Sequence, residues 1–495
     1  MPSPSTTLAP LRRAGAFAAL LAALAACAPM APPAAEPRPG IPAAFPGASG
    51  SDSAPVAAAT AWQDFFTEPE LRALISGALE HNRDLRAAVL RTEEARAAWG
   101  IQRAQRAPGL ALALEGARSR IPGDLSPTGQ PVVGDQFQLG VGFTSWELDF
   151  WGRIRSLEDA AIEGYLATDA ARRAATIGLV AQVAQSWLSL RETERRLLLA
   201  QRALDSRAES LRIHRRRVEL GASSRLELTQ VELLFRQAAS LRAQLEQARA
   251  AQANALRLLA GSEPGLPQAT ADGSPLARLP ELPADLPSSL LLERPDLVAA
   301  EHRLRAAGAN IAAARAAFFP RIALTATAGT ASTALGGLFE GSGRAWTFAP
   351  SVMLPIFDGG RLGAALELAA IRREQAVVDY EKTVQAAFRD VADALSARRW
   401  LGEQASILEE TLQLQAERAR LARLRHASGA ASYLEVLDAE RELLTVEQQL
   451  VQAQRAHLSA QVALYAALGG GARHLPAADP GASNRANPAA PEARR

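Results

Sequence analysis

The chain has 495 residues but a single cysteine, Cys27, so it cannot form an internal disulfide bond. It also has a single lysine, Lys382, and nearly all of its positive charge comes from arginine. The net charge of +2 does not favour nucleic acid as a partner, because that would require a basic patch. After residue 27 no segment has about 20 consecutive apolar residues, so the sequence contains no transmembrane helix.

The residue clusters that enzymes and metal sites require are also missing. The six histidines are scattered and do not have the spacing of metal ligands. The sequence has no phosphate-binding loop of the G-x-x-x-x-G-K type, so it has no nucleotide site of that kind. We therefore expect no enzymatic activity, no metal and no cofactor.

The N-terminal residues have the pattern of a secretory signal peptide. A positive pair, Arg12-Arg13, precedes an apolar stretch over 14–26 that is too short to span a bilayer as a stable anchor. The segment Leu24-Ala25-Ala26-Cys27 resembles the bacterial lipobox, in which the cysteine is lipidated and becomes the new N-terminus. We therefore predict that Cys27 is lipidated, and a plain signal peptide with an incidental cysteine is the alternative.

Most of the remaining chain is an internal duplication. Matching residues recur at two fixed offsets, 212 residues for the earlier pairs and 208 for the later ones. The pairs are Asp84-Leu85 and Asp296-Leu297, Pro108 and Pro320, Gly152-Arg153 and Gly360-Arg361, Gly221 and Gly429, and Gly261 and Gly469. Each copy has the same predicted order: a helix, two strands around a loop, a very long helix, a glycine turn and a second helix.

The distribution of proline predicts long helices in both copies. No proline lies between Pro131 and Pro264, or between Pro355 and Pro476. Proline inside a helix costs about 3 kcal/mol, so these intervals are typical of uninterrupted helix. Within them, Gly221 is suited to end one helix, as is its counterpart in the second copy, and the serines that follow can cap the next helix. Each interval therefore predicts a helical hairpin.

Hydrophobic residues in these intervals recur every seven residues, which is typical of coiled-coil packing. The positions are Val183, Leu190, Leu197, Leu204, Leu211 and Val218 in the first copy, and Leu437, Leu444, Val451, Leu458 and Tyr465 in the second. A second series in the first copy runs from Val231 to Leu259. An ordinary bundle core is the alternative, but a helix from Gly152 to Leu220 would be about 100 Å long, far beyond a globular domain.

Four segments alternate apolar residues with small or polar ones, which is the period of a strand. They lie at 110–115, 137–144, 322–329 and from Trp346 to Ile356. We expect each strand to run for about 9–11 residues, the length of a tilted transmembrane strand. Aromatic residues cluster at the strand ends, as in the girdles of membrane proteins. Ordinary core strands are the alternative.

One chain thus offers four strands. Known outer-membrane barrels need at least about eight, and open sheet edges cannot face lipid. Either the strands stay outside the membrane, or several chains close one barrel together. A dimer would supply eight strands around a plugged interior, and a trimer would supply twelve around a channel.

Five segments carry a specific resemblance. They are Glu147-Leu148-Asp149-Phe150-Trp151-Gly152-Arg153, Glu293-Arg294-Pro295-Asp296-Leu297, Ala316-Ala317-Phe318-Phe319-Pro320, Leu354-Pro355-Ile356-Phe357-Asp358-Gly359-Gly360-Arg361 and Leu464-Tyr465-Ala466-Ala467-Leu468-Gly469-Gly470-Gly471. Together they resemble the TolC-like outer-membrane efflux proteins, in the lipoprotein branch of OprM and NodT type. The resemblance covers about residues 62–471.

The resemblance implies an α+β membrane protein that forms a homotrimer. Its twelve strands, four from each chain, would close one β-barrel in the outer membrane, and its helices would form a hollow coiled-coil barrel through the periplasm. Shorter helices would stack end to end opposite the long ones. The implied function is a passive exit duct of a tripartite efflux system for drugs or other small molecules. Its partners would be a periplasmic adaptor and an inner-membrane pump of the resistance-nodulation-division type.

The resemblance also implies a gate at the periplasmic tip, where rings of acidic residues line a constriction. The segment from Gly429 to Asp438 matches that region, and Glu435 and Asp438 fall on the acidic positions. Three copies around an axis would attract cations. Solvated charges on a helix face are the alternative. Some relatives lock this gate with an arginine where this chain has Ala431, so that lock is missing here unless Arg423 or Arg425 substitutes for it.

The hairpin turns are the predicted contacts for the adaptor. They comprise Gly221, Ala222 and Ser223 in the first copy, and Gly429, Ala430 and Ala431 in the second. The first turn matches the family less fully. Glu227 aligns with Glu435, but Gln230 stands where Asp438 stands in the second copy.

The domain organisation follows from these patterns. We predict a signal peptide at 1–26, a lipidated tether at 27–60, a first efflux repeat at 61–261, a proline-rich linker at 262–287, a second efflux repeat at 288–471 and a disordered tail at 472–495. Two other functions stay open. The chain could be the outer-membrane duct of a type I protein secretion system, or a structural coiled-coil lipoprotein of the periplasm without a pore.

Overall fold

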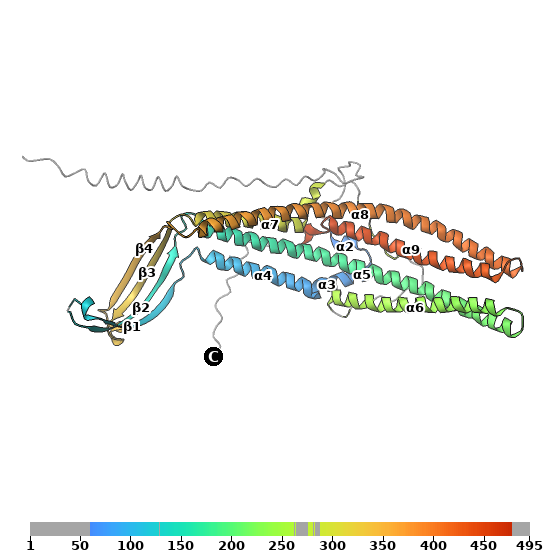
Figure 1. The fold of residues 1–495 in the computed structure, drawn as a ribbon, viewed down its shortest axis with the longest axis horizontal. Coiled ribbons are helices and arrows are strands. Elements are labelled where there is room, and N and C mark those ends of the chain that lie inside the picture. The colour runs from blue at the N-terminus through green and yellow to red at the C-terminus, as the bar shows by residue number, and fades with distance from the viewer. Residues whose placement is uncertain are drawn as a thin grey trace, which may run out of the picture. The chain divides into compact units, whose positions relative to one another are not determined.

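The computed structural model describes residues 60–477, except 128, 262, 264–275, 281 and 283–287. The predicted signal peptide, the lipidated Cys27, the tether up to residue 59, most of the linker and residues 478–495 lie outside this part of the chain. The described residues form two compact units (Figure 1). One contains residues 93–166 and 301–379 with all four strands, and the other contains the remaining described residues with both hairpin ends.

The strand unit holds one antiparallel sheet in the order β1-β2-β3-β4. The strands are β1 (Ala111–Ile121), β2 (Val132–Glu147), β3 (Arg321–Ser332) and β4 (Arg344–Met353). Strand β2 of the first copy pairs with β3 of the second, for example Leu139 with Thr330. The duplicated halves therefore share one sheet, and its outer strands β1 and β4 each have one side without a partner strand among the described residues.

The four predicted strands are confirmed, but two are longer than expected and one ends earlier. Strands β2 and β3 have 16 and 12 residues, more than the expected 9–11, and a bulge between Phe143 and Trp146 interrupts the pairing of β2 with β3. Strand β4 ends at Met353 and not at Ile356, because Pro355 has no N–H to continue a ladder. Pro350 is tolerated inside β4, paired with Leu324, because β4 is an edge strand.

The second unit contains most of two helical hairpins, as predicted, and the first parts of their long helices belong to the strand unit. Helices α5 (Arg153–Glu219) and α8 (Arg361–Ala427) have 67 residues each. Each is followed by a tight turn and a shorter helix, α6 (Arg225–Ala260) or α9 (Tyr433–Ala467). The hairpins pack along α5 and α9, where the Arg196 guanidinium donates to the Gln448 side chain at 2.7 Å and Arg455 donates to Glu192 at 2.9 Å.

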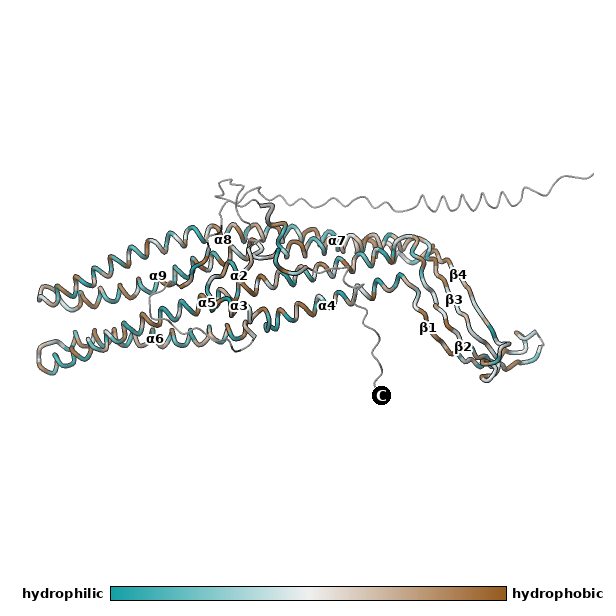
Figure 2. Tube along the Cα trace, turned by 180° about the vertical axis from the view of Figure 1, so that it is seen from behind, coloured by the Kyte–Doolittle hydropathy of each residue, from teal (hydrophilic) through white to brown (hydrophobic). Residues whose placement is uncertain are grey.

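The heptad series are confirmed as core positions. Buried members include Val183, Leu190 and Leu211 of α5, Val231, Ala238 and Leu245 of α6, and Leu437, Leu444 and Val451 of α9. In Figure 2, hydrophilic residues are spread along all four hairpin helices. Within the described residues, no helix combines the length and the apolar character that a membrane span would need.

The largest core lies where short N-terminal helices cover the hairpins. Helices α2 (Trp62–Phe65) and α3 (Pro69–His81) contribute to it together with α5 and α9. The ring of Tyr465 stacks on Phe65 at a centroid distance of 4.3 Å, and its hydroxyl donates to the Thr60 carbonyl at 2.9 Å. Burial raises the pKa of the Tyr465 hydroxyl. This contact ties the first described residues to the end of the second repeat.

At two equivalent joints, the start of one helix lies against the end of another. Helix α4 (Arg83–Ala104) starts at the end of α6, where the Asn82 side chain donates to the Leu259 carbonyl at 2.9 Å. Helix α7 (Pro295–Ala316) starts at the end of α9, where Arg294 donates to the Ala467 carbonyl at 2.8 Å. The two donors are 212 residues apart and the two acceptors 208, the offsets of the duplication. Each joint satisfies a carbonyl that the end of a helix leaves without an intrahelical partner.

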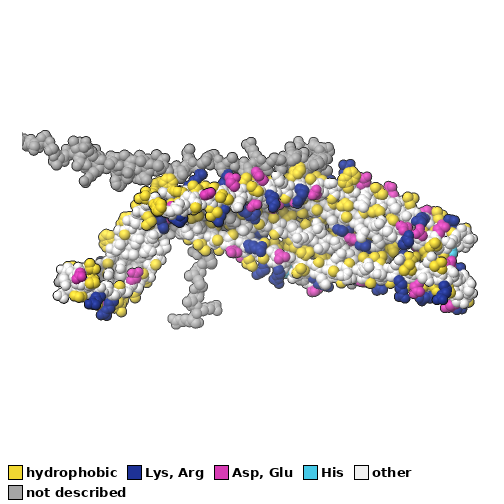
Figure 3. Space-filling view, viewed as in Figure 1, with side chains coloured by type: hydrophobic (Ala, Val, Ile, Leu, Met, Phe, Trp, Pro, Cys, Tyr) yellow, Lys and Arg dark blue, Asp and Glu magenta, His cyan; other side chains and the backbone are white. Residues whose placement is uncertain are grey.

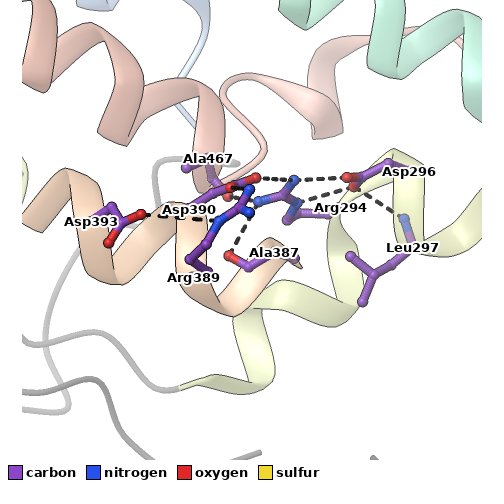
Figure 4. Close-up of polar contacts among 8 residues, drawn as sticks. All are labelled: Arg294, Asp296, Leu297, Ala387, Arg389, Asp390, Asp393 and Ala467. Atoms are coloured by element: carbon purple, nitrogen blue, oxygen red, sulfur yellow. Dashed lines mark hydrogen bonds and ion pairs between the residues drawn. The ribbon is translucent and has the colours of Figure 1, made fainter. Parts of the chain in front are cut away.

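The second joint differs from the first because it is ionic (Figure 4). The buried Arg294 guanidinium binds both oxygens of Asp296, at 3.0 and 2.7 Å, and lies 3.7 Å from Asp390. A cation at a helix C-terminus is favoured by the helix dipole. The joint therefore fixes α7, α8 and α9 against one another through one side chain.

The predicted disordered tail begins too early. Residues Ala472–His474 form a 3-10 helix with Ala472 buried, and Arg473 binds both oxygens of Glu293, at 2.9 and 2.6 Å. The Arg172 guanidinium also donates to the Pro476 carbonyl at 2.6 Å. These contacts hold residues 472–476 against other helices, which the local composition did not indicate.

Candidate functional site at the hairpin tips

The two turns have the same backbone geometry. Gly221 and Gly429 have φ of +72° and +75°, a conformation that residues with a Cβ rarely adopt. The next N–H in each turn, of Ala222 or Ala430, donates back to the carbonyl of Arg217 or Arg425, at 2.7 and 2.8 Å. These are Schellman turns, and they leave Gly221, Ala222, Gly429 and Ala430 exposed at the tips, with Ser223 and Ala431 half-buried.

The two predicted gate residues lie at the start of α9. Glu435 is in its first turn, where the helix dipole favours negative charge, and Asp438 follows on the next turn. Arg425 of α8 donates to Glu435 at 2.7 Å. Asp438 accepts from Arg418 of α8 at 2.6 Å and from Arg441 of α9 at 2.7 Å. Both carboxylates are therefore paired within their own hairpin.

This chain has Ala431 where some relatives have a locking arginine, and the two candidates to replace that arginine have different partners. Arg425 binds Glu435, whereas Arg423 binds Glu440 at 2.9 Å. All of these arginine side chains are more than 45% exposed, and exposed ion pairs contribute about 0–1 kcal/mol each. The pairs of Glu435 and Asp438, whose carboxylates are 38% and 40% exposed, can therefore exchange at little cost, whereas Glu440 is only 18% exposed. Figure 3 shows side chains of both charges gathered over the ends of both hairpins.

The first hairpin uses its acidic residue differently. Glu227 forms a capping box with Ser224, and the Ser223 hydroxyl also donates to its carboxylate. The Ser223 hydroxyl holds the pKa of Glu227 below its usual range. Although Glu227 aligns with Glu435, it serves as a helix cap, and no arginine contacts it among the hydrogen bonds and ion pairs of the described residues. The two tips are therefore not equivalent.

A cluster of aromatic rings joins the two hairpins just above the turns. Tyr433, the first residue of α9, lies with its ring centroid 4.2 Å from that of His214 of α5 and 5.1 Å from that of His426 of α8. Leu211, Val231 and Leu437 form the apolar layer next to it. Burial raises the pKa of Tyr433. Sequence reasoning missed this cluster, because its two histidines are 212 residues apart and have no motif.

Further along the same interface, a cavity of about 170 Å³ lies between α5, α8 and α9. Its walls include Arg202, Arg207, Arg423, Glu440 and Glu447. Burial lowers the pKa of Arg207, whose guanidinium donates to the Leu234 carbonyl at 3.0 Å, and burial raises the pKa of Glu447. In the described part of the chain, no group of His, Cys, Asp and Glu side chains is placed to hold a metal ion.

Comparison with known proteins matches most of the chain to one family. The model of the family described as "Outer membrane efflux protein" matches residues 74–262 and 286–470. The solvent efflux pump outer membrane protein SrpC of Pseudomonas putida is 45% identical over 83% of this chain and 87% of its own length. The outer membrane protein OprJ of Pseudomonas aeruginosa is 42% identical over 83% and 86%.

A solved structure agrees at the level of the fold. The open state of the MtrE outer membrane channel of Neisseria gonorrhoeae superimposes with a TM-score of 0.80 at 38% identity. The match covers 89% of this chain and 98% of that one. The four antiparallel strands, the long helices and the two repeated halves are thus features that this chain shares with a known channel.

Proposed function

Because the chain belongs to the outer membrane efflux protein family, we propose that it is the outer-membrane channel of a tripartite efflux system. In this role it conducts small molecules passively from the periplasm to the exterior. Its relatives include proteins named for solvent, toluene and antibiotic efflux, and we extend that range of compounds to this chain. Membership of a family of efflux proteins agrees with the prediction that the chain is not an enzyme.

The observation that carries this proposal is a sheet that is incomplete in one chain. In the part of the chain that the structure describes, strands β1 and β4 each present an unpaired edge, and apolar side chains along them are exposed, including Leu112 at 72% and Trp346 at 78%. Open apolar edges associate with other strands in water and cannot face lipid. Pairing β4 of one copy with β1 of the next closes twelve strands from three copies, so a homotrimer in the outer membrane accounts for both edges.

The hairpin unit supports a trimer independently. Helix α8 exposes Trp400, Ile407, Leu414 and Leu421, which are spaced by seven residues. This is a coiled-coil seam without a partner helix in the described chain. Helix α6 exposes Leu226 and Leu233 at the same spacing. A neighbouring copy would cover the seam, and each buried leucine would contribute about 1.5–3 kcal/mol.

The tip residues have distinct proposed roles. Glu435 and Asp438, brought together three times around the axis, form the periplasmic gate and favour cations. Their arginine partners lie in the same hairpin, so the gate is held by pairs that can exchange. The exposed turns at Gly221, Ala222 and Ser223 and at Gly429, Ala430 and Ala431 dock the periplasmic adaptor, and an inner-membrane pump of the resistance-nodulation-division type supplies the energy. A lipid on Cys27 anchors the N-terminus to the outer membrane.

Two measurements test this function. Light scattering after size exclusion should give the mass of three chains for the detergent-solubilised protein, and planar bilayers should show single-channel conductance. A monomeric mass, or a bilayer that stays silent with trimeric protein, would contradict the proposal. Deleting the gene should increase the sensitivity of cells to solvents and antibiotics. The Cys27→Ser variant tests the anchor separately through loss of acyl labelling.

A further inference from the structure

The buried imidazole of His214 is an unusual group to find in the packing between two hairpins. The residue is only 3% exposed. Its Nδ1 lies 3.0 Å from the Ser210 carbonyl, one turn earlier on α5. A carbonyl can only accept, so Nδ1 carries the proton and Nε2 of the neutral ring has a lone pair. Nε2 is buried and has no hydrogen-bond partner among the described residues.

A neutral ring fits this environment and a charged one does not. A second proton would turn Nε2 into a charged donor without an acceptor, and burial of an unpartnered charge is far more costly than burial of an unpartnered neutral nitrogen. The face of Tyr433, 4.2 Å away between ring centroids, offers a cation–π contact. That contact offsets only part of the cost, because it supplies no acceptor for the new N–H.

The charged groups around the cluster come from every helix that packs there. Helix α5 itself supplies the buried Arg207 and the exposed Arg217, both positive. Helix α6 supplies Glu227, whose carboxylate interacts electrostatically with His214 but is already bound by Ser223. Arg423 of α8 and Glu440 of α9 act on Tyr433 and bind each other. Glu227 is thus the one carboxylate in this set that acts on His214 directly.

The second histidine of the cluster is in a different position. His426 is half-buried, and its Nδ1 lies 3.2 Å from the Ala431 carbonyl within its own hairpin. Its ring contacts Tyr433 from the α8 side, so it packs inside the second hairpin and does not bridge to the first. Water can reach it when it is protonated, and its charge does not oppose the contact between the hairpins.

We propose that His214 is a proton-sensitive latch: in its neutral form it holds the first hairpin against Tyr433 of the second, and its protonation releases that contact and favours the open tip. This inference rests on the proposed channel function. Protonation becomes more favourable as the pH falls, so acidification loosens the latch. An acidic periplasm would therefore open the channel more readily.

The experiment compares the full-length trimer with two phenylalanine variants. His214→Phe keeps a ring against Tyr433 but cannot be protonated, and His426→Phe is the matched control on the other face of the same tyrosine. Conductance in planar bilayers is recorded at about pH 7.5 and about pH 5.5, within the range in which histidine side chains change charge. For the wild type we expect acidification to raise the ratio of open to closed channels roughly tenfold. A tenfold change corresponds to about 1.4 kcal/mol, which is near the lower end of the cost of one unsatisfied buried group. His214→Phe should lose this rise and His426→Phe should keep it.

A second measurement does not depend on conduction. Nitroxide labels at Ala222 and Ala430 report the distance between the two turns. Acidification should lengthen this distance in the wild type and in His426→Phe, and leave it unchanged in His214→Phe. A constant distance in the wild type would overturn the latch, and so would an equal response in all three proteins. A wild type that moves with pH but never conducts would support the latch and refute the channel function.

Discussion

Replacing Arg294 tests whether the joint between α9 and α7 depends on one ionic side chain. Arg294→Leu removes the bond to the Ala467 carbonyl and releases Asp296. A charge-assisted bond of this kind contributes about 1.5–3 kcal/mol. The pair with Asp296 contributes less, about 0–1 kcal/mol, because that carboxylate is 38% exposed. A cavity of about 750 Å³ borders the joint, so water can reach the freed groups and the loss falls at the lower end, at about 2 kcal/mol.

Hydrogen exchange measures this loss locally. The amides of Val298 and Leu468 form helical hydrogen bonds on the two sides of the joint, to the Arg294 and Leu464 carbonyls. A loss of about 2 kcal/mol should speed their exchange about 30-fold. Arg389→Leu is the control, because Arg389 pairs with Asp390 in the same region (Figure 4) but its side chain is 69% exposed. It should leave both amides unchanged.

The equivalent joint supplies an internal comparison. Asn82→Ala removes a neutral bond to Leu259 and the cap that Asn82 provides to the Leu85 amide. These contribute about 1 kcal/mol each, so the start of α4 should also exchange faster. If Arg294→Leu left Val298 and Leu468 as protected as in the wild type while Asn82→Ala loosened α4, the ionic joint would not be the element that holds the second repeat together.

Three further predictions follow from the hairpins. Gly429→Ala should destabilise the protein by about 1–2 kcal/mol in thermal unfolding because its φ is +75°, whereas Gly308→Ala, inside α7 with open space at its Cβ, should stabilise it by about 0.5–1 kcal/mol. The pKa of Glu227 is lowered, so the helix cap that it forms is intact at neutral pH and is lost as the pH falls through that lowered pKa. Ser223→Ala removes the main cause of the lowered pKa, so the amides in the first turn of α6 should lose their protection at a higher pH. Leu414→Glu places a charge on the exposed seam and should shift the detergent-solubilised protein towards monomer in size exclusion, and Gln413→Glu, one residue off the seam, should not.

Much of the candidate site was predictable from local pattern. The proline-free intervals and the glycine at each turn placed both hairpin tips correctly, and Glu435 and Asp438 do lie at the start of α9. The partners of those carboxylates were not predictable, since Arg418 is 20 residues from Asp438 and lies on another helix. The contacts of Glu227 were not predictable either, because Ser223 and Ser224 recruit it as a cap although it aligns with Glu435.

The sequence by itself determined the duplication, the four strands and the two hairpins. Each of these depends on a period or on a turn residue, which act over a few residues of chain. Only the tertiary structure decided that β2 pairs with β3 across the repeats, that Asn82 and Arg294 close equivalent joints, and that His214 meets Tyr433. Those contacts join residues about 170 or more positions apart, and no local pattern encodes which distant side chains complete a buried interface.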